Sequence, residues 1–189
     1  MQNYIKHLFL IVGATLLVTI SILLFWIGMA SAYQEEHLDF EKCYIYGLDR
    51  PVKCLDFEVP ENWDEPLGKQ ISLHAVIVPA SGGLAKPDPF VMFAGGPGQA
   101  ASEIGFLIRR DFGKINERRD VILLDQRGTG QSNKLACDLN LIPLKEISDA
   151  IVLEKITDCR NGYDVDVRHF TTFDAIKDME YLRDKLDVK

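Results

Sequence analysis

Hydrophobic residues follow three different patterns along the chain. From Leu8 to Ala30 there are 23 consecutive uncharged residues, most of them apolar. Between residues 52 and 59 apolar and polar positions alternate loosely, which predicts a half-buried strand. Residues 71–78 predict a second strand, and the turn-rich segment 60–68 lies between the two. We therefore expect an antiparallel hairpin with a long connection.

Two shorter runs are apolar without alternation, Phe90 to Phe93 and Val121 to Leu124. Continuous apolar runs of this length are typical of strands that are buried on both faces, as in a parallel sheet. A candidate helix from about Gln99 to Arg110 separates them. This order predicts a parallel crossover unit and an α/β fold, with a mostly parallel sheet behind an antiparallel amino-terminal hairpin.

The last third of the chain has weaker periodicity. A short helix is expected near Asp149 to Asp158. A firmer helix begins at Thr172, with Thr171 or Thr172 as its N-cap. Four apolar residues at helical spacing form one face of it: Ala175, Met179, Leu182 and Leu186.

The first 32 residues have the features of a leader. The segment 8–30 is long enough to cross a bilayer, and Lys6 before it orients the following chain outward. Ala30-Ser31-Ala32 offers a cleavage site, so an uncleaved membrane anchor and a cleaved signal peptide both stay open. A buried core helix is the third alternative. With either leader, residues 33–189 form an exported, periplasmic or extracellular domain.

Composition narrows the class of protein further. Hydrophobic residues make up 47% of the chain, which is ordinary for a globular protein, and all 28 Asp and Glu lie outside the leader. The sequence contains no basic stripe, so we expect no nucleic-acid partner. The four cysteines, an even number in an oxidising compartment, predict two disulfides; of three possible pairings we favour the two shortest loops, Cys43–Cys54 and Cys137–Cys159. Their spacing does not indicate a metal site.

A glycine-rich segment directly follows the first buried strand. Its residues Ala94-Gly95-Gly96-Pro97-Gly98 let the backbone turn sharply and bring N–H groups close to a ligand. Ligands of open α/β sheets bind at this end of the strands, and acyl-transfer enzymes take one oxyanion-hole amide from this loop. A plain strand-to-helix turn is the alternative. On the functional interpretation Gly96, with Gly95 beside it, supplies the oxyanion-binding amide.

A second glycine-bearing segment, Asp125 to Ser132, follows the next strand. Its charged pair, Asp125 and Arg127, indicates a tight turn through Gly128 that is fixed by an internal ion pair. Arg127 carries enough donors to hold several loop carbonyls. We therefore expect Asp125, Arg127 and Gly128 to be structural and not catalytic.

Together the two segments resemble the proline iminopeptidase and tripeptidyl aminopeptidase branch of the α/β-hydrolases. Members carry a His- or Ala-Gly-Gly-Pro-Gly loop and then Asp-Gln-Arg-Gly-x-Gly-x-Ser, which here are Ala94 to Gly98 and Asp125 to Ser132. Phe57 to Pro60 is similar to the family's entry strand, and Thr171 to Asp178 to the helix that leads to the nucleophile. The family's strand order, 1-2-4-3-5-6-7-8, would leave the strand 90–93 without its fifth-strand neighbour in this chain.

The chain departs from the family in its nucleophile. None of the seven serines lies in a Gly-x-Ser-x-Gly elbow, so the Ser-Asp-His triad is expected after Lys189. The chain alone would then be an inactive amino-terminal portion, either a partial sequence or a truncated product. His74 lies in an apolar strand and His169 precedes the last helix, and we expect neither to be a catalytic base.

The resemblance implies an exported serine hydrolase without a cofactor, which releases residues from peptide amino termini. Its partner would be a peptide or small acyl substrate, and also the membrane if the leader stays uncleaved. Two alternatives remain: an esterase on the same scaffold, and a membrane-tethered binding module without catalysis.

Overall fold

The computed structural model describes residues 19, 21–22, 38–96, 98–137 and 148–188. The chain divides into two units, Met1–His37 and Leu38–Lys189, and each is treated by itself. In the first unit the described residues 19, 21 and 22 have helical backbone, and the rest of the predicted leader 8–30 lies outside the described residues. Within the described part of the chain, no helix has the length and hydrophobicity that a membrane crossing requires.

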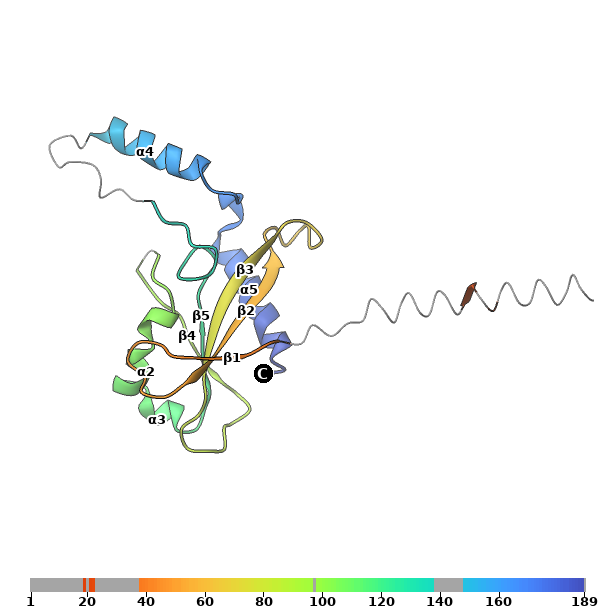
Figure 1. Ribbon diagram of the computed structural model, residues 1–189, viewed down its shortest axis with the longest axis vertical. Coiled ribbons are helices and arrows are strands. Elements are labelled where there is room, and N and C mark those ends of the chain that lie inside the picture. Colours follow the sequence, from red (N-terminus) through yellow and green to blue (C-terminus); the bar gives the residue numbers. More distant parts are fainter. Residues whose placement is uncertain (1–18, 20, 23–37, 97, 138–147, 189) are drawn as a thin grey trace, which may run out of the picture. The chain divides into compact units, whose positions relative to one another are not determined.

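The second unit contains a five-stranded sheet and several helices (Figure 1). In chain order the elements are β1 (Glu41–Cys43), β2 (Val52–Pro60), β3 (Gln70–Val78), β4 (Phe90–Met92), η1 (Ser102–Ile104), α2 (Phe106–Arg110), α3 (Gly113–Asn116), β5 (Val121–Leu124), α4 (Asp149–Asn161), η3 (Val167–His169) and α5 (Thr172–Lys185).

The strands are arranged in the order β1-β2-β3-β5-β4. β2 and β3 form the predicted antiparallel hairpin, and β4 and β5 form the predicted parallel pair. From β2 onward this order agrees with the 1-2-4-3 arrangement that the resemblance implied, and it leaves β4 at one edge of the described sheet. The expected parallel majority is not found among the described strands, because β1–β2, β2–β3 and β3–β5 all pair antiparallel.

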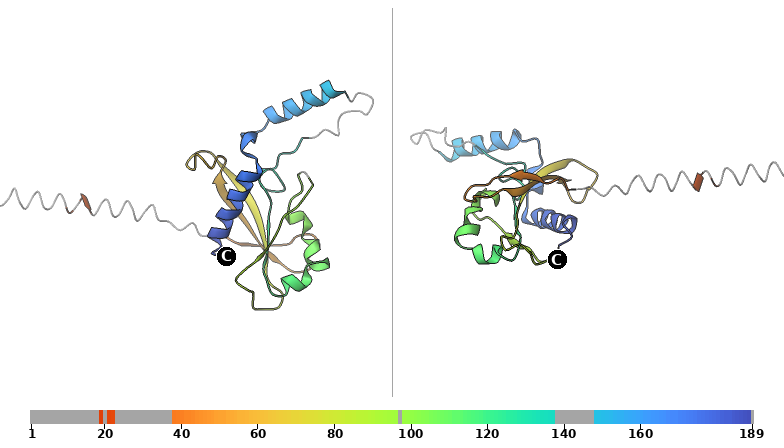
Figure 2. Two further views of the ribbon diagram at one scale, coloured as in Figure 1. Left: turned by 180° about the vertical axis from the view of Figure 1, so that it is seen from behind. Right: turned by 60° about the horizontal axis from the view of Figure 1, so that its bottom comes forward.

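Helices cover both faces of the sheet (Figure 2). α5 packs Leu182 and Met179 against one face, in a cluster with residues such as Leu73 and Ile122. η1 and α2 pack Ile104 and Ile108 against the other face. β5 contributes alternate side chains to the two clusters and is buried at all four positions, as its unbroken apolar run predicted.

Three local features differ from the sequence-based expectation. β1 precedes the first strand that the sequence predicts, and it pairs with the first residues of β2. The helix expected from about Gln99 begins later, as the 3-10 turn η1 followed by the five-residue α2. α3 was not expected, because its four residues are too few to show a periodic pattern.

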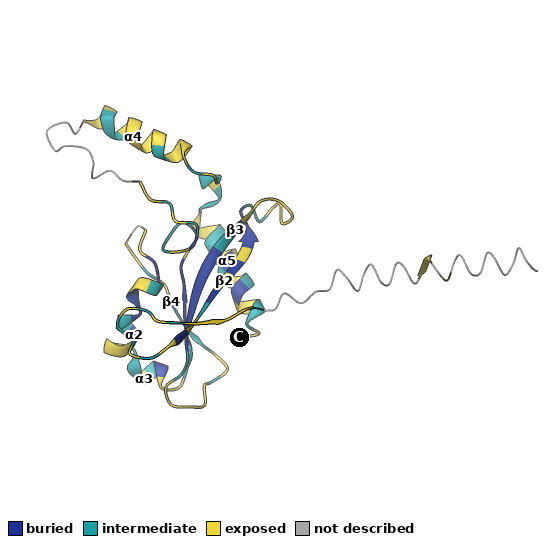
Figure 3. Ribbon diagram, in the orientation of Figure 1, coloured by how far each residue is buried: buried dark blue, intermediate teal, exposed yellow. Residues whose placement is uncertain are grey.

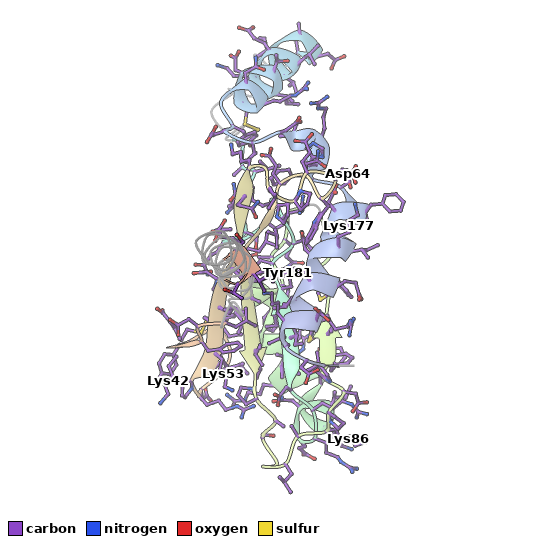
Figure 4. All side chains as sticks on the ribbon, turned by 90° about the vertical axis from the view of Figure 1, so that its right-hand side faces the viewer. Lys42, Lys53, Asp64, Lys86, Lys177 and Tyr181 are labelled. Carbon is purple, nitrogen blue, oxygen red and sulfur yellow. A yellow bond between two sulfur atoms is a disulfide. The ribbon has the colours of Figure 1, made fainter. Side chains whose placement is uncertain are left out.

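α5 agrees closely with its sequence signals. The Thr171 side chain caps it by accepting a hydrogen bond from the Asp174 N–H. The Nζ of Lys177, about one turn into the helix, lies 3.7 Å from Oδ1 of Asp64 in the β2–β3 connection (Figure 4). Tyr181 stacks on Phe57 of β2. These contacts hold the helix along the hairpin.

Both disulfides have the pairing that the sequence favoured. Cys43–Cys54 joins β1 to β2, and Cys137–Cys159 joins the segment after the 125–132 turn to α4. None of the residues of α4 is buried, and the helix is exposed along most of its length (Figure 3). The second disulfide is therefore the main tertiary restraint that we can assign to α4.

Replacing Cys137 and Cys159 together by alanine should release α4 while the sheet stays folded. An isolated 13-residue helix is marginal in water, since nucleation is costly and α4 buries no apolar face. Amide hydrogen exchange should show lost protection in residues 149–161 and unchanged protection in β3 and β5. The matched control is the double alanine variant of Cys43 and Cys54, which should leave α4 protected. Equal protection of α4 in all three proteins would contradict the prediction.

Candidate oxyanion loop at the carboxyl edge of the sheet

Three strands end at the same edge of the sheet. β5 runs parallel to β4 and antiparallel to β3, which in turn is antiparallel to β2. The carboxyl ends of β2, β4 and β5 therefore lie on one side (Figure 1). The loops that follow them, 61–69, 93–101 and 125–135, carry both motifs of the sequence. This is the edge at which α/β folds bind ligands.

The loop after β4 presents two free backbone amides. Gly95 and Gly96 are exposed, and Gly96 has a φ of +92°, which L side chains rarely adopt. The Gly96 carbonyl accepts a hydrogen bond from the Gln99 N–H at 3.1 Å. Within the described residues, no hydrogen bond uses the N–H of Gly95 or Gly96, and a Cβ added to either would meet no atom within 4 Å. Both amides are therefore available to a ligand.

Asp125 and Arg127 do not form the ion pair that the sequence suggested. The turn after β5 sends the two side chains to opposite faces of the sheet. Asp125 accepts hydrogen bonds from Ser102 at the start of η1, and Arg127 reaches Asp178 of α5. Because the Ser102 hydroxyl donates to Asp125, it is not a free nucleophile.

Arg127 forms the most connected polar cluster of the described chain. Its guanidinium holds Asp178 through two hydrogen bonds, Nε to Oδ2 at 2.7 Å and Nη2 to Oδ1 at 2.6 Å. The remaining donors reach three backbone carbonyls, those of Pro60, Glu61 and His169. The expectation that Arg127 holds several loop carbonyls is confirmed. The side chains of both charged partners are 1% exposed.

Asp178 receives a further hydrogen bond from the Trp63 indole N–H at 2.9 Å. Burial raises the pKa of the Asp178 carboxyl, while the hydrogen bonds from Arg127 and Trp63 oppose that rise. All the polar atoms of this buried pair have partners, which is the condition under which a buried ion pair is tolerated. The cluster joins β2, the 125–132 turn and α5.

The rest of the second motif fastens the turn to β3. The Ser132 hydroxyl accepts a hydrogen bond from the His74 N–H at 2.8 Å, and Asn133 accepts one from the Ser72 N–H at 3.3 Å. Gly128 has a φ of +87°, and a Cβ there would lie 3.1 Å from Phe170. The turn therefore continues the pairing of β3 beyond the end of β5.

The two histidines of the second unit have structural surroundings. His74 is buried, and its Nδ1 lies 2.6 Å from Asp56 Oδ1. The backbone carbonyl of His169 accepts from Arg127, and its Nε2 is 4.0 Å from Asp166. Neither lies in the loop 93–101. Among the described residues, no group of His, Cys, Asp and Glu could hold a metal ion.

Sequence reasoning missed three residues of this edge. The sequence pattern did not indicate that Ser102 and Asp178 are the partners of Asp125 and Arg127. Gly130, with φ +51°, was not singled out although a Cβ there would lie 2.1 Å from Asp125 Oδ2. Asp178 lies in the family-like stretch that begins at Thr171, so the resemblance could have indicated its importance.

A small apolar groove lies between α5 and the strands β4 and β5. Its volume is about 190 Å³, and it is lined by residues of β4, β5 and α5 with their flanks: Pro89, Val91, Phe93, Ile122, Met179, Glu180, Leu182, Arg183 and Val188. Phe93 is 62% exposed beside it. The loop after β4, which carries Gly95 and Gly96, begins beside this groove.

Comparison with known families agrees with the observed topology. The model of the alpha/beta hydrolase fold family matches residues 88–189, more than half of the chain, and this stretch includes both glycine-bearing loops and α5. Among curated proteins, none matches the sequence. On the family match and the strand order together, the chain belongs to the α/β-hydrolase fold family.

Proposed function

We propose that the chain supplies the oxyanion-binding part of an exported serine hydrolase that releases residues from peptide amino termini. The observation that carries the proposal is the pair of Gly95 and Gly96 amides, which have no hydrogen-bond partner among the described residues and directly follow the parallel strand β4. In acyl transfer, donors held in this way stabilise the negative oxygen of the tetrahedral intermediate. Family membership supports the hydrolase class, and the two sequence motifs support the aminopeptidase branch.

On this proposal the chain supplies the oxyanion cradle and not the nucleophile, because none of its seven serines lies in a Gly-x-Ser-x-Gly elbow. An attacking serine would transfer its proton to a histidine that an aspartate orients, and the resulting oxyanion would lie against the amides of Gly95 and Gly96. The chain itself contributes the cradle and its rigid support. The Asp125 and Arg127 clusters hold the two loops that flank this cradle.

Substrate choice tests the proposed reaction. We expect a longer protein that contains this chain together with a Ser-Asp-His triad to cleave aminoacyl or tripeptidyl p-nitroanilides and to react with a fluorophosphonate probe. The 189-residue chain should do neither above background. Hydrolysis of p-nitrophenyl esters without peptide amides would favour the esterase. Absence of both activities in the longer product would contradict the hydrolase and favour the binding module.

Export forms a separate part of the proposal. Two disulfides are typical of proteins that mature in an oxidising compartment. Fractionation of cells that express the chain, followed by alkylation of free thiols, should find Cys43, Cys54, Cys137 and Cys159 unmodified outside the cytoplasm. Reduced, fully alkylated protein in the cytoplasmic fraction would contradict export.

A further inference from the structure

The Asp125 carboxylate connects the two loops at the carboxyl edge. It is fully buried and accepts three hydrogen bonds, from Ser102 N at 2.8 Å, from Ser102 Oγ at 2.9 Å and from Gln131 N at 3.2 Å. The backbone N–H of Asp125 donates a hydrogen bond to the carbonyl of His74. A rigid strand end thus holds the first residue of η1.

The loop that carries the candidate amides depends on its two ends. Gly96 and Gly98 both have positive φ, are exposed, and have no atom within 4 Å of an added Cβ, so they provide few contacts of their own. β4 fixes one end of this loop. Ala100 and Ala101 at the other end are buried, and Ser102 follows them. That second end is therefore held both by the burial of the two alanines and by the hydrogen bonds from Ser102 to Asp125.

The packing between the two loops leaves no room for a side chain at Gly130. A Cβ at Gly130 would lie 2.1 Å from Asp125 Oδ2 and 2.5 Å from Ala100 Cβ. Separations below 3.0 Å require something to shift. The turn after β5 and the loop after β4 therefore pack closely where the backbone of Gly130 lies against the Asp125 carboxylate and Ala100.

We propose that Asp125 is a positioning residue that holds the loop 93–101, and with it the amides of Gly95 and Gly96, in the geometry that binds an oxyanion. That Asp125 holds the loop follows from hydrogen bonds and packing alone. That this hold affects catalysis rests on the proposed function.

The conformational part is tested on the 189-residue chain by amide hydrogen exchange. In Asp125→Ala, the hydrogen-bonded amides within 93–104, such as those of Gln99 and Ser102, should exchange at least roughly tenfold faster, because three donors lose a charged acceptor. Asp125→Asn should show a smaller increase, since its Oδ1 can still accept from Ser102 N. If Asp125→Ala does not fold, Ser102→Ala, which removes one of the three hydrogen bonds, is measured in its place.

The matched control is Asn116→Ala at the opposite edge of the sheet. Asn116 is buried, donates to the carbonyls of Val78, Pro79 and Arg119 and accepts from Arg50, so its loss also removes several hydrogen bonds from one buried side chain. It should not accelerate exchange in 93–104. Equal acceleration in both variants, or none in the Asp125 and Ser102 variants, would overturn the inference.

Kinetics separate the inference from the proposed function. In a hydrolytically active protein that contains this chain, Asp125→Asn should lower kcat by roughly tenfold or more with KM nearly unchanged, because oxyanion stabilisation acts on the transition state. Faster loop exchange together with unchanged kcat would support the positioning role and overturn the oxyanion assignment. A rise in KM alone would overturn the catalytic part of the inference.

Discussion

Replacing Gly96 by valine should lower the kcat of the hydrolytically active protein by a factor of roughly 10²–10³, the usual loss for one oxyanion-hole donor. Gly96 has a φ of +92°, which a β-branched residue can adopt only under strain. The backbone should therefore rotate and turn the amide away. Side-chain bulk is not the cause, because a Cβ at this position meets open space. Steady-state kinetics on a peptide amide would measure the loss.

Gly83→Val is the matched control for this experiment. Gly83 has a φ of +94°, and a Cβ there also meets no atom within 4 Å, but it lies in the connection that precedes β4. Its strain is thus similar and its location is at the other edge of the sheet. We expect its kcat to match that of the unmodified protein. If the two valine variants had the same kcat, the oxyanion loop would have to be placed elsewhere.

Asp178→Ala should lower the free energy of unfolding by about 3–5 kcal/mol, because it leaves the Arg127 guanidinium buried without a counter-charge. The Trp63 N–H loses its acceptor in the same variant. The effect should appear in urea titration as a lower midpoint with a similar slope. It would also loosen the contact of α5 with β2 and the 125–132 turn.

Asp184→Ala provides the comparison on the same helix. Asp184 is exposed near the carboxyl end of α5, where an acidic side chain is unfavourable to the helix dipole. Its removal should change the free energy of unfolding by no more than about 0.5 kcal/mol. A loss at Asp178 as small as that at Asp184 would show that the Arg127 cluster contributes little to stability.

Much of the fold could be predicted because its signals are local. Unbroken apolar runs identified β4 and β5, and the alternation of Leu55, Phe57 and Val59 identified one face of β2. Thr171 indicated where α5 begins, since an N-cap side chain bonds an amide only a few residues away. Loop length alone was enough to favour the observed disulfides.

Short and irregular elements could not be predicted in the same way. β1 has three residues, two of them charged or polar, and it forms because β2 and the Cys43–Cys54 bond hold it. The helix expected from Gln99 was placed too early, because Ala100 and Ala101 are buried in the loop and not on a helix. Tertiary packing overrides local preference at such positions.

By itself the sequence indicated β2 to β5, α4, α5 and the positions of the glycine bends, since each of these signals depends on residues close together in the chain. It also suggested the acyl-transfer interpretation of the first bend, which stays a prediction. Only the tertiary structure decided which charges meet. Arg127 pairs with a carboxylate 51 positions away, and Asp125 with a serine 23 positions away, because the turn after β5 sends the two side chains to opposite faces of the sheet. Long-range polar contacts follow from how layers pack, and no local pattern in the chain contains that information.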